Sequence, residues 1–308
     1  MADQVSAREA IEGPIPTLDP AEALARAREG KGYWKRVWES LKDDKVTIVV
    51  AIVLLLIFLA AIFAPLIATH DPSKGSIIGR LKGFGYKDHL LGTDETGRDM
   101  FSRLVFGARL SLISGVLPVI FALLIGGSLG IAAGYLRGRV NTVIMRSMDV
   151  LYAFPSILLA IAICGILGSG LENTLLALTI TFIPPIVRVS ETVTVQVRSL
   201  DFVDAARTSG ASSASIMCRH VLNNVLGQIL VYTTSLVSLS IILAAGLSFL
   251  GLGVTPPDAE WGLMLNNLRQ AIWVNPTIAA LPGVAIFITS MSFNLLSDGL
   301  RQAMDIRL

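Results

Sequence analysis

The residue types that most often carry catalytic or metal chemistry are sparse in this chain of 308 residues. Its three histidines, His70, His89 and His220, lie far apart in the sequence, which predicts three unrelated loop or interface residues rather than a cluster. The two cysteines, Cys164 and Cys218, exclude a disulfide framework and a CxxC metal knuckle. No GxxxxGK[ST], HExxH or GxSxG motif occurs. We therefore predict no catalytic residue, no metal ligand and no cofactor bound by this chain.

The polar side chains that could contact a solute are neutral and lie within apolar segments. The candidates for lining a pathway are Tyr232, Ser235, Ser238 and Asn294. Such hydroxyl groups could face a hydrated path or donate back to carbonyls of their own helix, and the sequence leaves both interpretations open. No ionisable residue lies near the middle of an apolar segment, which disfavours a carrier driven by protons or sodium.

Composition and patterning place these residues on membrane-spanning helices. Of the residues, 53% are hydrophobic and 16% are charged, well below the charged share of a soluble domain. Because a bilayer core requires about 20 apolar residues in a helix, we predict six spans and an all-α integral membrane protein. The windows without Asp, Glu, Lys or Arg are 46–70, 110–136, 150–171, 173–187, 220–257 and 270–297.

The distribution of basic residues predicts the orientation. Lys and Arg gather in the N-terminal tail, in 135–147 and in 188–224, so both termini are expected in the cytoplasm. The net charge of +2 does not indicate a nucleic-acid partner. The N-terminal part is predicted to contain a cytoplasmic tail with an interfacial helix (1–45), a first span (46–68) and a periplasmic loop (69–110). A core of five further spans (111–298) follows, and it includes a cytoplasmic loop (199–224) and a periplasmic loop (252–275). The chain is predicted to end in a cytoplasmic tail (299–308).

Two amphipathic segments are expected to lie at the membrane surface. Segment 32–45 carries an apolar stripe with two tryptophans, and segment 99–112 carries a similar stripe. Packing of these segments on their own bundle is the alternative. Within the spans, Gly126, Gly130 and Gly134 share one helix face, which favours close approach of another helix. The pair Pro184-Pro185 predicts a kink.

The loop 199–224 predicts two short helices joined at a fixed angle. Asp201 is the expected cap of the first helix, and Gly210 is expected to end it in the left-handed conformation. Ser212 or Ser213 can cap the second helix. Such an element could transmit force as a lever, and a solvated helix–turn–helix is the alternative.

This loop resembles the coupling motif of ABC importer permeases, usually written E-A-A-xxx-G-x9-I-x-L-P. The matching residues are Asp204, Ala205, Ala206, Gly210, His220 and Leu222. Asp204 replaces the motif's Glu, and His220 replaces its Ile. Asn223 replaces the terminal Pro, which removes a stop signal and predicts that the second helix runs on toward the next span.

Four further segments make the resemblance specific to the C-type permeases of the dipeptide/oligopeptide/nickel family. They are Leu91–Asp99, Ser102–Arg109, Met148–Pro155 and Phe249–Gly262, and with the loop they span roughly residues 45–300 in the expected order. The resemblance implies the type I ABC importer fold, with six spans and both termini inside, in the bacterial inner membrane.

The resemblance also implies partners. They are a homologous second permease forming a heterodimer, two ATPase subunits that hold ATP and magnesium, a periplasmic substrate-binding protein, and membrane lipid. Trp261 and Trp273 are candidates for a docking surface or an external gate, with structural capping of the bundle as the alternative. The expected cargo is a di- or oligopeptide, and nickel chelates, glutathione and opine-like solutes are alternatives. A stand-alone channel or carrier and a membrane-embedded enzyme are the competing functions.

Overall fold

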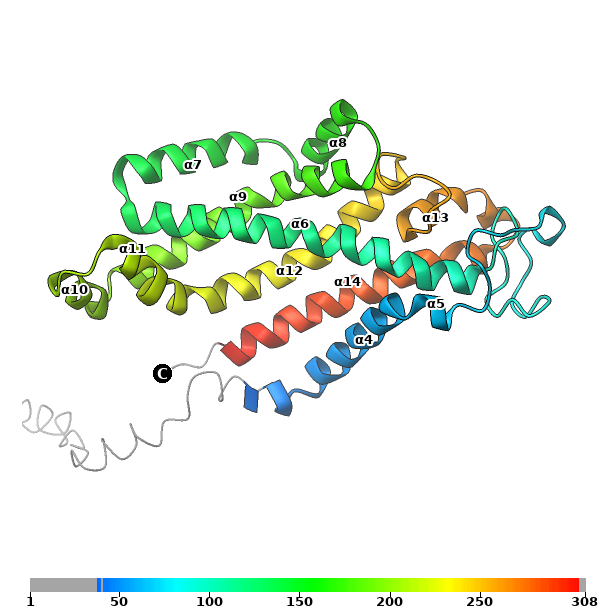
Figure 1. Cartoon of the computed structure of the whole chain (residues 1–308), viewed down its shortest axis with the longest axis horizontal. Helices are drawn as coiled ribbons and strands as arrows, with labels where there is room; N and C mark the ends of the chain where they lie inside the picture. The colour runs from blue at the N-terminus through cyan, green and yellow to red at the C-terminus, as the bar shows by residue number, and fades with distance from the viewer. Residues whose placement is uncertain (1–37, 40, 305–308) are drawn as a thin grey trace, which may run out of the picture.

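The computed structural model describes residues 38–39 and 41–304, and its regular structure there is helical (Figure 1). In this part of the chain, β-pairing is limited to isolated bridges in the loop before residue 100. Five described helices are long and apolar enough to cross a membrane, or six if one bent pair counts as a single span. These five are α4 (Lys45–Ile62), α6 (Met100–Leu136), α9 (Leu171–Arg198), α12 (Leu222–Phe249, continuous with the short helices before it) and α14 (Pro276–Met304).

The segment predicted as the first span, 46–68, contains two helices. Helix α4 begins where the Asp44 carboxylate accepts a hydrogen bond from the backbone N–H of Val46 at 3.0 Å. The short helix α5 (Ala64–Ile67) continues it after a break at Phe63. Most of the interfacial helix expected over 32–45 lies outside the described residues, so that expectation stays a prediction.

The second span begins earlier than predicted. Segment 99–112 is the first part of α6 rather than a separate interfacial helix, and the preceding loop therefore ends at Asp99 instead of residue 110. The reason is local: Asp99 accepts a hydrogen bond from the Ser102 N–H at 2.7 Å, and no helix breaker follows before the apolar segment. With 37 residues, α6 is about 55 Å long and extends beyond a bilayer core of about 30 Å.

Gly126, Gly130 and Gly134 form a glycine stripe on α6 that packs against α9, as their spacing predicted. A Cβ added at Gly130 would lie 2.5 Å from the Cβ of Ser190, and one at Gly134 would lie 2.7 Å from the Cβ of Thr194. The two helix backbones therefore approach so closely that only glycine fits at these positions.

The third predicted span is not one straight helix. Helices α7 (Gly138–Tyr152) and α8 (Ser156–Leu167) are bent by 84° at the break between them. Pro155 sits at this break; it has no N–H, and it disfavours helical backbone in the residue before it. By contrast, α9 continues through Pro184 and Pro185 to Arg198.

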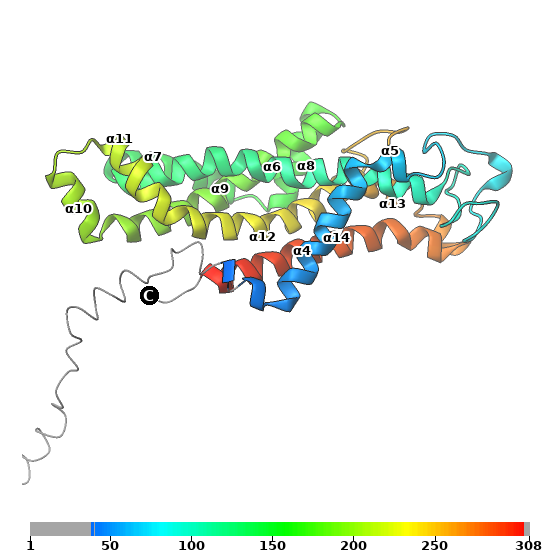
Figure 2. The ribbon, with the colours of Figure 1, turned by 60° about the horizontal axis from the view of Figure 1, so that its bottom comes forward.

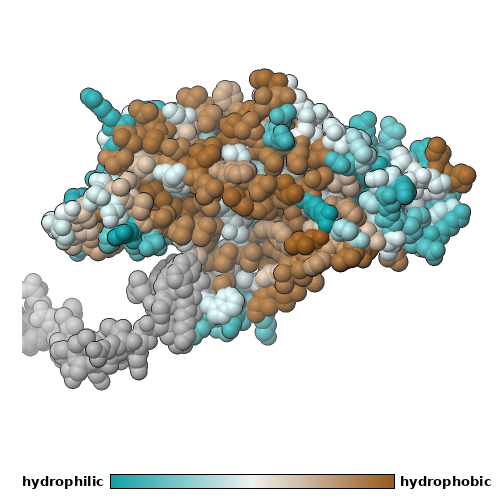
Figure 3. Space-filling model, viewed as in Figure 1, coloured by the Kyte–Doolittle hydropathy of each residue, from teal (hydrophilic) through white to brown (hydrophobic). Residues whose placement is uncertain are grey.

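The remaining elements complete an elongated bundle. Helices α10 (Asp201–Thr208), α11 (Ser213–Ser215) and η2 (Ile216–Val221) lie at one end, and α13 (Trp261–Asn267), η3 (Ala271–Trp273) and the loop before α6, which contains η1 (Ile77–Gly79), lie at the other (Figure 1). Helix α4 crosses α14 obliquely and contacts it (Figure 2). Hydrophobic residues cover the middle of the visible surface, while hydrophilic residues gather toward both ends (Figure 3). This distribution fits a bundle that spans a bilayer.

Candidate functional site

Helix α10 is a short amphipathic helix at one tip of the bundle. Asp201 was predicted to cap it, and this is wrong: Leu200 is the N-cap residue, and it makes no side-chain capping bond. Asp201 and Asp204 instead lie in the first turn, where the helix dipole favours negative charge. Arg207 in the last turn pairs with Asp204 at 2.9 Å between Nη1 and Oδ1. These charges stabilise both ends of the helix.

One buried side chain anchors α10 to the bundle. Val203 is fully buried, while Asp204 and Ala205 are exposed and Ala206 is half-buried. The apolar cluster around Val203 consists of Tyr135, Val193, Ile216, Val221, Val225 and Ile229. Residues of α6, α9, η2 and α12 contribute to this cluster, and α10 itself packs against η2. Its outer face, with Asp204 and Ala205, remains open.

The first helix ends at Gly210 in the left-handed conformation, as predicted, and its end forms a Schellman motif. Gly210 has φ +81°, and its N–H donates to the carbonyl of Arg207 at 3.1 Å. The N–H of Ala211 donates to the carbonyl of Ala206 at 3.2 Å, which completes the motif. A Cβ added at Gly210 would meet no atom within 4 Å. The glycine is therefore needed for its backbone conformation and not for packing within this chain.

The second helix runs directly into the next candidate span, as the missing proline predicted. Ser212 caps its start, and α11, η2 and α12 form one continuous helix from residue 213 to 249. His220 and Leu222 are half-buried on this helix and are not on the exposed face of α10. Asn223, in place of the motif's proline, keeps its backbone N–H and donates from Nδ2 to the carbonyl of Arg219 at 3.0 Å.

A cavity of about 410 Å³ lies beside the bend between α7 and α8. Tyr232 on α12 lines it, so one predicted pathway residue is placed at a hollow in the bundle. Ser235 and Ser238 do not line it; their hydroxyls donate to the carbonyls of Tyr232 at 2.7 Å and Ser235 at 2.8 Å, respectively. Asn294 is exposed on α14. The lining consists of Leu151, Tyr152, Ala153, Phe154, Pro155, Ser156, Leu159, Thr181, Phe182, Pro184, Pro185, Tyr232, Leu236 and Leu239.

An ion pair holds α7 against α9 next to this cavity. Arg188 Nη2 contacts Asp149 Oδ1 at 2.6 Å, and the Arg188 guanidinium lies 4.9 Å from the centre of the Tyr152 ring. Since Tyr152 also lines the cavity, the bend, the ion pair and the hollow form one local unit.

At the opposite end, the predicted docking residues have different environments. Trp261 is only 3% exposed, and its Nε1–H donates to the carbonyl of Leu104 at 3.0 Å. It therefore caps the bundle, and the interpretation that it forms a docking surface is wrong. The buried Glu260 caps α13 by accepting the N–H of Leu263 at 2.8 Å. Trp273 is 89% exposed and remains a docking candidate.

The loop before α6 is fixed by a buried arginine. Arg103 is 1% exposed, and its Nε lies 3.2 Å from Asp94 Oδ2. Its guanidinium also donates to the carbonyls of Pro72 at 3.1 Å and Asp258 at 3.4 Å. Asp94 and Arg103 belong to the segments Leu91–Asp99 and Ser102–Arg109, which carry the family resemblance. In the structure they together connect the loop before α6 with the loop that contains Asp258.

The same end contains a group that the sequence analysis missed. His70 and His89 were predicted to be unrelated, and this is wrong: their ring centres lie 4.4 Å apart, and a donor atom of each ring lies within 4.8 Å of an Asp99 carboxylate oxygen. His220 lies at the far end, as expected from its place in the loop. The sequence positions of His70 and His89 do not predict this contact, because the contact depends on how the loop before α6 folds.

Two family models match the chain. The model described as binding-protein-dependent transport system inner membrane component matches residues 126–308. The model described as N-terminal TM domain of oligopeptide transport permease C matches residues 32–82. The two matches together cover most of the chain, including the two short helices of the loop 199–224 and the cavity beside Tyr232.

Relatives and solved structures agree with these matches. The glutathione transport system permease protein GsiD of Pectobacterium atrosepticum is 40% identical over 301 residues, which is 98% of each chain. GsiD of Escherichia coli O157:H7 is 39% identical over 97% of this chain and 96% of its own length. Inward-facing structures of the MetNI methionine ABC transporter cover 66% of this chain and 97% of theirs with TM-scores of 0.55 and 0.56, at 18% and 19% identity. The latter likeness concerns the fold.

Proposed function

Because this chain belongs to the family of binding-protein-dependent transport system inner membrane components, we propose that its Asp201–Asn224 hairpin is where partner ATPase subunits drive transport. As a member, it is a multi-pass permease of the inner membrane with the fold of ABC importers. The proposal concerns what that permease carries and how it receives energy. The hairpin is its input, and the cavity beside Tyr232 is part of its pathway.

The continuity of α12 supports the mechanical step. Val203 fixes α10 to the bundle, and the helix that starts at residue 213 continues without a break to the cavity wall at Tyr232. From Leu222 to Tyr232 the rise is about 15 Å. The connection between α10 and this helix is only residues 209–212, so a partner that moves α10 would also move one wall of the cavity.

Energy comes from nucleotide bound elsewhere. Two ATPase subunits carrying ATP and magnesium would hold α10 of this chain and the matching helix of a homologous second permease. ATP binding favours the closed ATPase pair, and only such differential affinity can shift the permease between inward- and outward-facing states. A periplasmic binding protein would deliver the solute from the opposite end, where Trp273 is exposed.

We propose short peptides of the size of glutathione as the cargo. The glutathione permease names of the relatives support this class, and so does the cavity lining, which contains no charged side chain. A lining of this kind tolerates different peptides, so selection would rest mainly with the binding protein. Uptake of labelled glutathione, competed by dipeptides, tripeptides or nickel chelates, tests the class; competition by nickel chelates alone contradicts it.

A pair of glycine variants tests the input. Gly210 and Gly251 both have φ +81°, both end a helix, and at neither would an added Cβ meet an atom within 4 Å. Gly210→Trp and Gly251→Trp thus impose the same backbone strain at opposite ends of the molecule. We expect Gly210→Trp to reach the membrane, to lose co-purification with the ATPase subunits and to lose uptake. Gly251→Trp should retain the ATPase. A Gly210→Trp complex that holds its ATPase and transports normally contradicts the proposal.

A further inference from the structure

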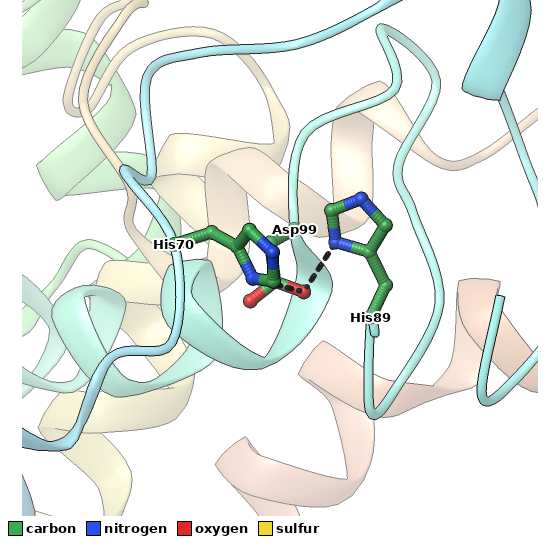
Figure 4. A group of neighbouring side chains, drawn as sticks. All are labelled: His70, His89 and Asp99. Carbon is green, nitrogen blue, oxygen red and sulfur yellow. Dashed lines mark hydrogen bonds and ion pairs between the residues drawn. The ribbon is translucent and has the colours of Figure 1, made fainter. Parts of the chain in front are cut away.

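Two imidazoles and one carboxylate converge at the outer end of the bundle (Figure 4). They come from three segments: His70 follows α5, His89 lies in the outer loop, and Asp99 caps α6. One donor atom from each lies within 4.8 Å of the other two. The transport mechanism above uses none of these three residues.

The distances suit a transition-metal ion. Asp99 Oδ1 lies 2.9 Å from His89 Nδ1 and 3.9 Å from His70 Nδ1. Two ligands of a tetrahedral zinc ion, each at about 2.0–2.1 Å from the metal, are about 3.3 Å from one another. The two observed distances bracket this value, so small side-chain rotations would bring the donors to bonding distance.

The carboxylate is already oriented for this role. Its Oδ2 accepts hydrogen bonds from the Ser102 N–H at 2.7 Å and the Thr69 hydroxyl at 3.3 Å, and so Oδ2 does the capping of α6. Oδ1 is not needed for the cap and faces the two rings. Outer hydrogen bonds that fix a ligand in this manner are typical of metal sites.

Access and donor chemistry define the ion. The Asp99 side chain is fully buried, whereas those of His89 and His70 are 19% and 37% exposed. An ion can therefore enter past the histidines, and water can occupy a fourth position. Two nitrogen donors and one oxygen donor favour zinc, nickel or copper over magnesium and calcium, which prefer oxygen ligands.

From this geometry we propose that His70, His89 and Asp99 form a binding site for a divalent transition-metal ion, zinc in the first instance. The ion cross-links the end of the first span, the outer loop and the start of α6. It thereby stabilises the outer surface of the permease, at the end opposite the hairpin.

Zinc titration of the full chain tests the site. The chain is purified in lipid nanodiscs through a tag without histidine, and ZnCl2 binding is measured by calorimetry. We expect one zinc ion per chain, with affinity reduced roughly tenfold or more in His70→Ala and in His89→Ala. His220→Ala, which removes the third histidine at the far end, should leave the affinity unchanged. Excess Mg²⁺ should not displace zinc.

Several results would overturn the site: no zinc binding by the unmodified chain, a zinc affinity in His70→Ala and His89→Ala equal to that of the unmodified chain, or displacement of zinc by Mg²⁺. His70→Ala leaves the hydrogen bond that caps α6 intact, so its metal-free unfolding temperature should match that of the unmodified chain. Co²⁺ added to the unmodified chain gives a reading independent of any variant. Visible absorption bands of a four-coordinate ion are expected, and their absence overturns the proposal.

Discussion

Val203 is the residue on which the rigidity of α10 depends. Its side chain is fully buried, and it is the buried member of an otherwise accessible helix. Val203→Ala removes two methyl groups, at about 0.8 kcal/mol each, and adds a cavity cost. We expect the amides of α10 to exchange with deuterium about tenfold faster while the spans stay protected.

Phe202→Ala is the matched control for this variant. Phe202 is the neighbouring residue in α10, and it is 38% exposed. Its truncation should change the exchange of α10 little. Equal acceleration in both variants, or none in Val203→Ala, would show that Val203 is not the anchor.

At the scale of single residues, the sequence predicted features that depend on nearby backbone atoms, but it did not predict contacts between distant segments. Gly210 and Ser212 were placed correctly because each acts through backbone atoms a few residues away. Asp201 was displaced from the capping position by a single residue. The approach of His70 to His89 and the burial of Trp261 depend on tertiary folding of the outer loops, which no local pattern encodes.

At the element scale, the contact of α6 with α9 rests on backbone proximity. A Cβ at Gly130 would lie 2.6 Å from the carbonyl oxygen of Val187, whereas one at Gly127 on the same helix would meet only Leu123 Cδ1 at 3.6 Å. Gly130→Ala should therefore destabilise the chain by about 1–3 kcal/mol through overpacking. Gly127→Ala should be neutral or stabilising, since alanine favours helix.

Thermal unfolding of the two purified variants in detergent measures this difference. The unfolding temperature of Gly130→Ala should fall below that of the unmodified chain, and that of Gly127→Ala should not. Equal unfolding temperatures would mean that α6 and α9 do not depend on the glycine stripe for their packing.

The windows without charged residues predicted some membrane-spanning helices correctly, but they did not predict where a helix is interrupted. The windows located α4, α9, α12 and α14, because a bilayer imposes length and apolarity on each. They failed at the bend between α7 and α8, where charge-free sequence continues through Pro155. Pro155 lies at this break, but proline alone does not predict it, because α9 continues through Pro184 and Pro185. A segment without charged residues is expected to lie in the membrane, but it is not necessarily one continuous helix.

At the scale of the whole molecule, the hairpin and the outer loops must face opposite sides of the membrane. Ser209 lies in the hairpin and Ser73 in the loop before α6, and both are exposed. In a chain with Cys164→Ala and Cys218→Ser, a membrane-impermeant maleimide should label Ser73→Cys in intact cells and Ser209→Cys only in inverted vesicles. The reverse pattern would contradict the predicted orientation.

The bundle therefore carries distinct chemistry at its two ends and a hollow between them. One end presents α10 without any contact that occupies its outer face within the described residues, and the other is closed by buried ion pairs such as Asp94 with Arg103. A continuous helix, residues 213–249, joins the first end to the cavity. This arrangement suits a subunit that receives force at one end and solute at the other.

Site-specific photo-crosslinking from α10 tests that central claim most directly. A photoreactive residue at Ala205, exposed on the outer face of α10, is compared with one at Thr142, exposed on α7. In the assembled transporter, the residue at position 205 should crosslink to the ATPase subunit both with and without ATP, and that at 142 should do so much less. No crosslink from position 205, or equal crosslinking from both positions, would contradict the account.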